Sequence, residues 1–182
     1  MRDRTWKFIG LGLAVAFFTY RLSPQLDVLR GGSVGDEMPA FAVKTLDEVP
    51  ITRDSALGKV VLVNFWASWC GPCVTEMPAF DRVYHAKKDQ GFVVLGIWTN
   101  DTDPFAMYDF LREHAIRYPI IVGAEELVES FGGVWALPVS ILIDRNGKIV
   151  KRVTGIFAEE ALRTEVERLL SESARAPVQT GR

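Results

Sequence analysis

The clearest pattern along the chain is an alternation between continuous apolar runs and segments of helical periodicity. Residues 59–65 and 92–98 are apolar runs preceded by Gly58 and Gly91, which is typical of strands that a sheet buries on both faces. Between them, apolar side chains recur at helical spacing over residues 73–88. This order predicts two parallel strands of a central sheet, joined by a helix.

Shorter elements flank this unit. Residues 39–50 alternate weakly between apolar and polar, which suits an edge hairpin. The later elements are expected to be a helix from Asp103 to about Glu113, a strand over 118–122, a helix over 125–131, strands over 139–143 and 148–153, and a helix over 158–170. The last two strands are joined by residues 144–147, whose Asn-Gly pair is a strong hairpin signal. The chain is therefore expected to form an α/β fold: a central sheet, parallel in its first part, with an antiparallel edge and helices on both faces.

The first 22 residues differ from the rest. Three basic residues within the first seven positions precede an uncharged run over residues 8–20, about 20 Å long as a helix at ~1.5 Å per residue. That is short for a hydrocarbon core of ~30 Å, although Lys7 and Arg21 can extend the span by snorkelling. A retained membrane anchor over residues 1–22 and a cleaved signal peptide both stay open. We favour the anchor, because cleavage after residues 14–16 would leave only six apolar residues in the signal.

Both interpretations place the rest of the chain outside the cytoplasm, because the positive flank stays inside. We therefore expect a protein of the cell inner membrane with its catalytic domain on the periplasmic or extracytoplasmic side. A buried helix of the globular domain is disfavoured, since the basic flank would have no role there. Residues 23–35 are interpreted as a linker, 36–171 as one folded domain and 172–182 as a disordered tail.

Composition supports a single domain with an ordinary core. The 182 residues are 48% hydrophobic and 24% charged, with a formal net charge of −2. Because no block rich in lysine or arginine occurs, a nucleic-acid partner is not expected.

Cysteine usage changes the picture, because the whole chain has two, Cys70 and Cys73. A small secreted domain stapled by disulfides would carry several, spread along its length. The one possible pair here closes a loop with two intervening residues, which constrains the unfolded chain little. The pair is therefore poorly placed as a staple and indicates chemistry instead.

The two cysteines stand where the first buried strand ends and the helix begins. A thiol reacts as its thiolate, and the free N–H groups and the positive dipole end of a helix N-terminus stabilise that form. We assign Cys70, expected to be exposed at the helix cap, as the nucleophile, and the more buried Cys73, one turn later, as the resolving thiol. The predicted reaction is thiol–disulfide exchange with a partner protein through a mixed disulfide.

A metal site is the main alternative use of this spacing. Zinc needs about four ligands, and the chain has no second pair of this kind. His85 and His114 lie in helical patterns and are expected on helix surfaces, so we expect no metal centre. A copper-carrying assembly factor, with copper held by both thiolates, stays open as an alternative, although no third ligand is nearby.

The cysteines also carry a resemblance to a known family. Residues 64–73, with the letters NFWASWCGPC, resemble the active-site signature of the thioredoxin superfamily, and WCGPC matches it letter for letter. Pro78 matches the proline in the family's following helix. Residues 131–138 resemble the segment that ends in the family's cis-proline, here Pro138, which faces the cysteines. The resemblance covers roughly residues 35–170.

Within the superfamily the chain looks most like the membrane-anchored TlpA/ResA-type branch. The resemblance implies a thioredoxin fold with an N-terminal β-hairpin extension and a central strand-helix insertion. It also implies an extracytoplasmic thiol–disulfide oxidoreductase that reduces disulfides in partner proteins, in cytochrome c maturation or metal-site assembly. No cofactor beyond the Cys70/Cys73 redox disulfide is implied, and a transmembrane thiol carrier of the CcdA/DsbD type is the implied reductant.

The resemblance also implies which residues meet the substrate. Trp69 is expected to belong to an exposed apolar collar that contacts partners, beside Gly71 and Pro72 of the active-site pentapeptide. Leu137 and Pro138 are expected to offer a flat edge to the backbone of the partner.

The polar residues near the cysteines depart from the cytoplasmic members. At the position of Asn64, cytoplasmic thioredoxins carry an aspartate that accepts the proton of the buried thiol, and an asparagine cannot do so. Glu76 matches an acidic position of the TlpA/ResA branch, and we hypothesise that it accepts the proton of Cys73. The alternative is that Glu76 only favours the dipole at the helix N-terminus.

Two other redox functions fit the sequence less well than a reductase does. An oxidant of the DsbA type is disfavoured, because the Gly-Pro pair between the cysteines matches the reducing members. A thiol peroxidase typically has a threonine where this chain has Ala67. The remaining tryptophans near the site, Trp66 and Trp98, are expected in the core. The particular substrate stays open, because Val139 and Ser140 follow Pro138 where many relatives have a threonine.

Overall fold

The computed structural model describes residues 32–99 and 104–173. The predicted anchor, most of the linker, most of the tail and Asp103, the predicted helix cap, lie outside these residues. In the part that is described, none of the helices has the length and apolar character needed to cross a membrane.

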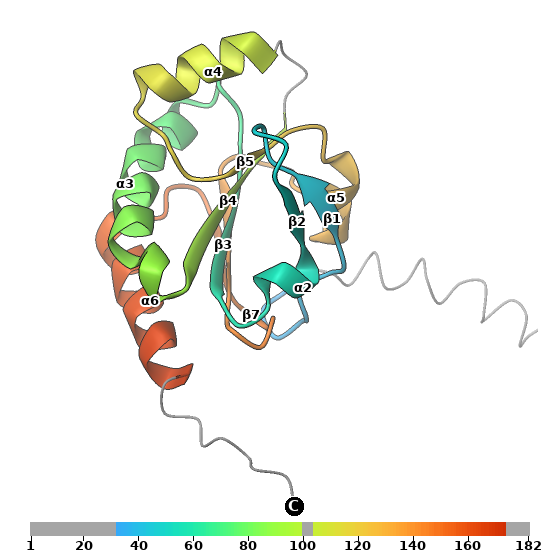
Figure 1. The fold of residues 1–182 in the computed structure, drawn as a ribbon, viewed down its shortest axis with the longest axis vertical. Helices are drawn as coiled ribbons and strands as arrows, with labels where there is room; N and C mark the ends of the chain where they lie inside the picture. The colour runs from blue at the N-terminus through green and yellow to red at the C-terminus, as the bar shows by residue number, and fades with distance from the viewer. Residues whose placement is uncertain (1–31, 100–103, 174–182) are drawn as a thin grey trace, which may run out of the picture.

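A five-stranded mixed sheet forms the centre of the fold, with the strand order β5-β4-β3-β6-β7 (Figure 1). Its strands are β3 (Val60–Trp66), β4 (Phe92–Trp98), β5 (Ile120–Ile121), β6 (Val139–Ile143) and β7 (Ile149–Thr154). β3, β4 and β5 run parallel, whereas β6 is antiparallel to β3 and β7 is antiparallel to β6. The predicted parallel first part and antiparallel edge are thus confirmed.

Helices cover both faces of this sheet, as expected from the uninterrupted apolar character of β3 and β4. One face carries α3 (Gly71–Lys87), α4 (Pro104–Glu113) and α6 (Glu159–Ser173), and the other carries α2 (Arg53–Ala56) and α5 (Glu125–Ser130) (Figure 1). In β3, Leu62 and Trp66 belong to the core under α3, whereas Val63 and Phe65 belong to the core under α5. Side chains alternate between the two faces along a strand. A strand that is covered on both faces therefore appears in the sequence as a continuous apolar run, without alternating polar positions.

The N-terminal hairpin forms a small sheet of its own. β1 (Ala42–Lys44) and β2 (Pro50–Thr52) pair antiparallel, and single bridges at Glu37 and Thr45 connect this region to the main sheet. The helix α2 that follows was not expected. It is a four-residue helix with a capping box between Thr52 and Ser55, too short to produce a periodic pattern.

The ends of the domain extend slightly beyond their predicted limits. The N–H of Gly35 donates to the carbonyl of Ile149 at 2.9 Å, so the end of the predicted linker already joins β7. At the other end, α6 continues to Ser173, two residues beyond residue 171, the expected end of the folded domain. A short 3-10 helix, η1 (Lys88–Gln90), follows α3.

Arg152, on β7, holds the end of α5 against the sheet. Its guanidinium donates hydrogen bonds to the carbonyls of Phe131 at 2.8 Å, Gly133 at 2.9 Å and Gly32 at 3.0 Å. Burial lowers the pKa of this guanidinium, yet it stays a cation because arginine is not deprotonated in proteins. One side chain therefore fixes the start of the loop that runs from α5 to β6.

Replacing Arg152 with alanine is expected to lower the free energy of unfolding by about 2–3 kcal/mol, because buried carbonyls lose a charged donor. Urea unfolding of the disulfide form measures this change. The matched control is Arg168→Ala on α6, whose guanidinium contacts the carboxylates of Glu165 and Glu172 at the surface. Such exposed pairs contribute less than about 1 kcal/mol, and equal losses in the two variants would contradict the role given to Arg152.

Candidate functional site

The two cysteines form a disulfide at the junction of β3 and α3. Their Cα atoms are 5.3 Å apart, and Cys70 is the N-cap residue of α3, with its sulfur accepting the N–H of Cys73 at 3.3 Å. The predicted pairing and its place at a helix N-terminus are confirmed. The N–H of Cys73 would stabilise a thiolate of Cys70 after reduction, because it already donates to this sulfur at the helix N-terminus.

The burial of the pair differs from the expectation in one respect. Cys73 is fully buried, as predicted, but Cys70 is only 5% exposed instead of standing open at the cap. The sulfur of Cys70 is bonded to that of the buried Cys73, and the N–H of Cys70 donates to the carbonyl of Ala67. The residues that an approaching partner meets first are the exposed Gly71 and Pro72 and Trp69, whose side chain is 70% exposed.

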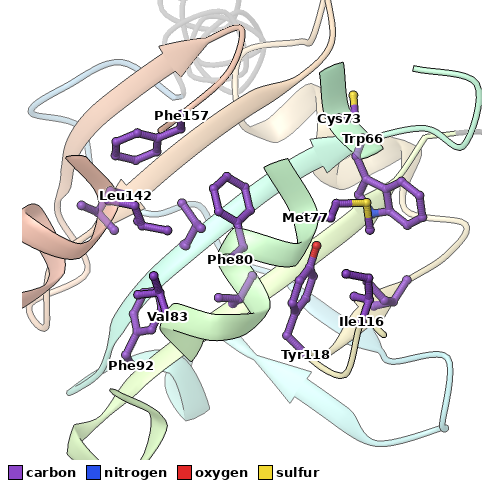
Figure 2. Close-up of a cluster of buried hydrophobic side chains, with 14 of the residues drawn as sticks. Trp66, Cys73, Met77, Phe80, Val83, Phe92, Ile116, Tyr118, Leu142 and Phe157 are labelled. Atoms are coloured by element: carbon purple, nitrogen blue, oxygen red, sulfur yellow. The ribbon is translucent and has the colours of Figure 1, made fainter. Parts of the chain in front are cut away.

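The buried face of α3 connects the disulfide to the core. Cys73, Met77 and Phe80 follow one another along α3 and belong to the same buried cluster (Figure 2). Trp66, at the end of β3, is fully buried and stacks on Phe110 with 5.4 Å between ring centroids. The prediction of Trp66 as a core residue under the site is confirmed.

Glu76 is a buried carboxylate on the same helix as the cysteines, with 2% of its surface exposed. The N–H of Phe157 donates to its Oε2 at 2.9 Å, and Nδ2 of Asn64 donates to its Oε1 at 2.9 Å. It lies in the second turn of α3, whereas dipole effects fall off within the first turn. This position argues against a role limited to the helix dipole.

The surroundings of Glu76 move its proton affinity into the neutral range. Burial raises the pKa of this carboxyl from 4.5 to about 7, and the hydrogen bonds from Phe157 and Asn64 oppose the shift only partly. A group with this pKa can take up and release a proton at neutral pH. Asn64 also donates to Oγ of Ser140 at 3.1 Å, so it joins the carboxyl to β6, a link that sequence reasoning missed.

The loop before β6 supplies the second side of the site. The peptide bond between Leu137 and Pro138 is cis, as the resemblance implied, and the carbonyl of Pro138 accepts the N–H of Gly155 at 2.8 Å. Pro138 itself is buried, and Leu137 is half-buried. Of the two residues expected to offer an edge to the partner, Leu137 is therefore the more accessible.

A surface groove with a volume of about 440 Å³ opens beside the disulfide. We call it the tryptophan groove, because Trp69, Trp98 and Trp135 line it. The rest of its wall comes mainly from Glu125, Val128 and Glu129 of α5 and from Val134, Ala136 and Leu137 of the following loop.

The structure shows features of two of these tryptophans that the sequence did not predict. Trp98 is buried, as predicted, yet it also lines the groove. Trp135, for which the sequence pattern predicts no particular environment, is 97% exposed, which is unusual for so large an apolar side chain. Its position between two glycines and a cis-proline was the only signal that could have indicated exposure.

The described residues, 32–99 and 104–173, contain no cluster of three or more histidine, cysteine or acidic side chains that could hold a metal ion. His85 is half-buried, with Nε2 at 3.7 Å from Oδ2 of Asp81. The ring of His114 stacks on Phe110 at 4.2 Å, just past the end of α4. His85 therefore lies on α3 beside Asp81, and His114 lies at the end of α4 against Phe110. Both are distant from the cysteines in the sequence.

Comparison with known proteins identifies a family and relatives of this chain. The model of the Redoxin family matches residues 33–170. The thiol-disulfide oxidoreductase ResA of Bacillus anthracis is 33% identical over 129 residues, which cover 71% of this chain and 74% of that protein. ResA of Bacillus subtilis is 29% identical over 130 residues, covering 71% of this chain and 72% of that protein.

Solved structures agree with this result. A thiol:disulfide interchange protein of the thioredoxin family from Chlorobium tepidum matches with a TM-score of 0.69 and 27% identity, over 77% of this chain and 99% of that one. StoA from Bacillus subtilis matches with a TM-score of 0.61 and 25% identity, over 69% of this chain and 95% of that one. The thioredoxin fold expected from the active-site letters is confirmed.

The raised pKa of Glu76 predicts a pH-dependent stability. The folded protein binds this proton more tightly than the unfolded chain, so the wild type loses stability as the pH rises from about 4.5 to about 7. Glu76→Gln removes the titration, and its stability relative to the wild type should therefore increase over the same interval. Urea unfolding of the disulfide forms across this pH range measures the difference.

Glu159→Gln is the matched control for this experiment. Hydrogen bonds from Arg82 hold the pKa of Glu159 below its ordinary value, so its stabilising effect is lost only as the pH falls below about 4.5. Between about pH 4.5 and 7 the control should follow the wild type in parallel. If the stability of Glu76→Gln also changes with pH in parallel with that of the wild type, then Glu76 titrates near its ordinary pKa. The pKa shift attributed to its burial would then be wrong.

Proposed function

The chain belongs to the Redoxin family and is a ResA-like thiol–disulfide oxidoreductase, and from this premise we propose that it reduces disulfides in partner proteins. The observation that carries the proposal is the Cys70–Cys73 disulfide at the N-terminus of α3, with the buried carboxyl of Glu76 one turn beyond Cys73. This arrangement supplies a stabilised thiolate, a resolving thiol and a proton acceptor in one helix.

The reaction starts from the reduced protein. The thiolate of Cys70 attacks one sulfur of the substrate disulfide, that S–S bond breaks, and the departing sulfur leaves as a thiolate that takes a proton from water. Cys73 then attacks Sγ of Cys70, and the second substrate sulfur leaves. Two electrons pass from the two thiols to the substrate, and the protein is left with its own disulfide.

Glu76 acts in the second of these steps. Burial disfavours the charged form of a thiol, so the fully buried Cys73 needs a nearby base before it can attack. The ionised carboxylate of Glu76 takes this proton, and its pKa of about 7 lets it return the proton to solvent or to a departing thiolate. The hydrogen bonds from Asn64 and Phe157 keep the carboxylate in place.

The cellular setting is part of the same proposal. The basic and apolar N-terminal segment supports an anchor in the cell inner membrane, with the catalytic domain on the periplasmic or extracytoplasmic side. The oxidised protein would be reduced again by a transmembrane thiol carrier of the CcdA/DsbD type. Its substrates would be protein disulfides formed during cytochrome c maturation or metal-site assembly. The mass of the membrane-extracted protein, compared with that of the full chain, tests whether the anchor is retained.

The reduction potential of the Cys70/Cys73 couple tests the direction of electron transfer. We expect a value near or below about −250 mV for the full chain, equilibrated with glutathione and dithiothreitol buffers at neutral pH. A value near about −120 mV would make the protein an oxidant of the DsbA type, and the reductase proposal would fall.

The pH titration of Cys73 tests the role of Glu76. In Glu76→Gln the titration of this thiol should lose its coupling to a neighbouring carboxyl and move to lower pH, because a nearby negative charge disfavours the thiolate and that charge is gone. The Cβ chemical shifts of ¹³C-labelled cysteine in the reduced chain follow the titration, and Cys70→Ser assigns the two signals. Glu159→Gln serves as the control, and an identical Cys73 titration in Glu76→Gln would leave Glu76 with a structural role only.

A further inference from the structure

The wall that α5 contributes to the tryptophan groove is acidic. Glu125 and Glu129 of α5 both line the groove, and residues four apart lie on the same side of a helix. From residue 123 to residue 138 the chain contains three glutamates and no lysine or arginine. With an overall net charge of −2, the protein has concentrated negative charge beside its reactive site.

These carboxylates have no counter-charge of their own. Within residues 32–99 and 104–173, neither the Glu125 nor the Glu129 side chain forms a hydrogen bond or an ion pair. Like charges at this spacing destabilise a helix, so a cation placed between them would relieve a repulsion as well as gain an attraction. Arg152 does not supply this cation, because its guanidinium is engaged by backbone carbonyls.

The groove also presents apolar surface that nothing in the described chain covers. Trp69 and Trp135 are its most exposed members, and the ring of Trp135 lies over Gly133, where a Cβ atom would come within 3.4 Å of Nε1. Trp98, almost fully buried in the groove wall, has an indole N–H without an acceptor among the described residues. Exposed aromatic surface and an unused donor together are typical of a surface that binds a polypeptide.

The position of the groove relates it to the chemistry. It starts at Trp69, the neighbour of Cys70, and at Leu137, the neighbour of the cis-proline, and it extends from there to α5. A polypeptide whose disulfide lies at Cys70 can therefore continue into the groove without leaving the surface.

We propose that the tryptophan groove binds an extended segment of the substrate protein that carries an apolar side chain and a lysine or arginine close to the disulfide being reduced. The apolar side chain packs between Trp69 and Trp135, and the cation lies between Glu125 and Glu129. The inference rests on the proposed function, because it describes the substrate of that same reaction. It makes the protein selective for disulfides in basic segments.

The test uses the reduced full-length chain and three synthetic peptides. Each peptide has the same intramolecular disulfide and an adjacent leucine, and two flanking positions are lysine, glutamine or glutamate. At low salt the lysine peptide should be reduced roughly tenfold faster than the glutamate peptide, with the glutamine peptide between them. High salt should shrink this ratio, because it screens exposed charges.

Matched variants locate the source of the selectivity. In Glu125→Gln/Glu129→Gln the ratio of the lysine and glutamate rates should fall close to one. Glu126→Gln removes the same kind of charge from the same helix, but its side chain lines a separate depression with Phe41 and Val43, so the ratio should persist. Trp135→Ala should slow the reduction of all three peptides.

The outcomes separate this inference from the proposed function. Equal rates for the three peptides, or a ratio that survives Glu125→Gln/Glu129→Gln, would overturn the inference and leave the reductase intact. A reduced chain that reacts with none of the peptides and also leaves the neutral 2-hydroxyethyl disulfide unreduced would overturn the proposed function itself.

Discussion

The site depends on one buried carboxyl, that of Glu76. A carboxylate loses the hydration of its charge when a core encloses it, so it persists there only with donors built around it. Here the donors come from two places distant in sequence, the side chain of Asn64 in β3 and the N–H of Phe157 before α6. The fold thereby raises the pKa of an ordinary acidic residue to about 7, three positions after Cys73 on the same helix.

The central strand β3 makes this arrangement possible. It is buried on both faces, and it ends at the segment that leads into the cysteines. Its alternate side chains belong to different cores, which holds α3 on one side and α5 on the other. The reactive helix and the acidic wall of the groove are therefore positioned by the same strand, while Arg152 fixes the loop between α5 and the cis-proline.

The sequence was informative where the signal is local. Apolar runs located β3 and β4, and a ten-residue signature located the disulfide and the fold, because both depend on neighbours in the chain. The features that the sequence did not predict are contacts between distant residues and the exposure of individual side chains. Asn64 meets Ser140 across 76 positions, which no periodicity reveals. The burial of Cys70 and Pro138 and the exposure of Trp135 follow from how the loops pack against one another. The four residues of α2 make little more than one helical turn, so no periodicity can be recognised there.

The disulfide contains all the sulfur of the chain that can form a covalent bond to another protein, because Cys70 and Cys73 are its only cysteines. A chain in which only Cys70 remains has a single point of attachment. Any covalent complex recovered with such a chain therefore has one linkage chemistry and one location. The identity of a captured partner and the site of its capture are established by the same observation, without the competing adducts that a third thiol would allow.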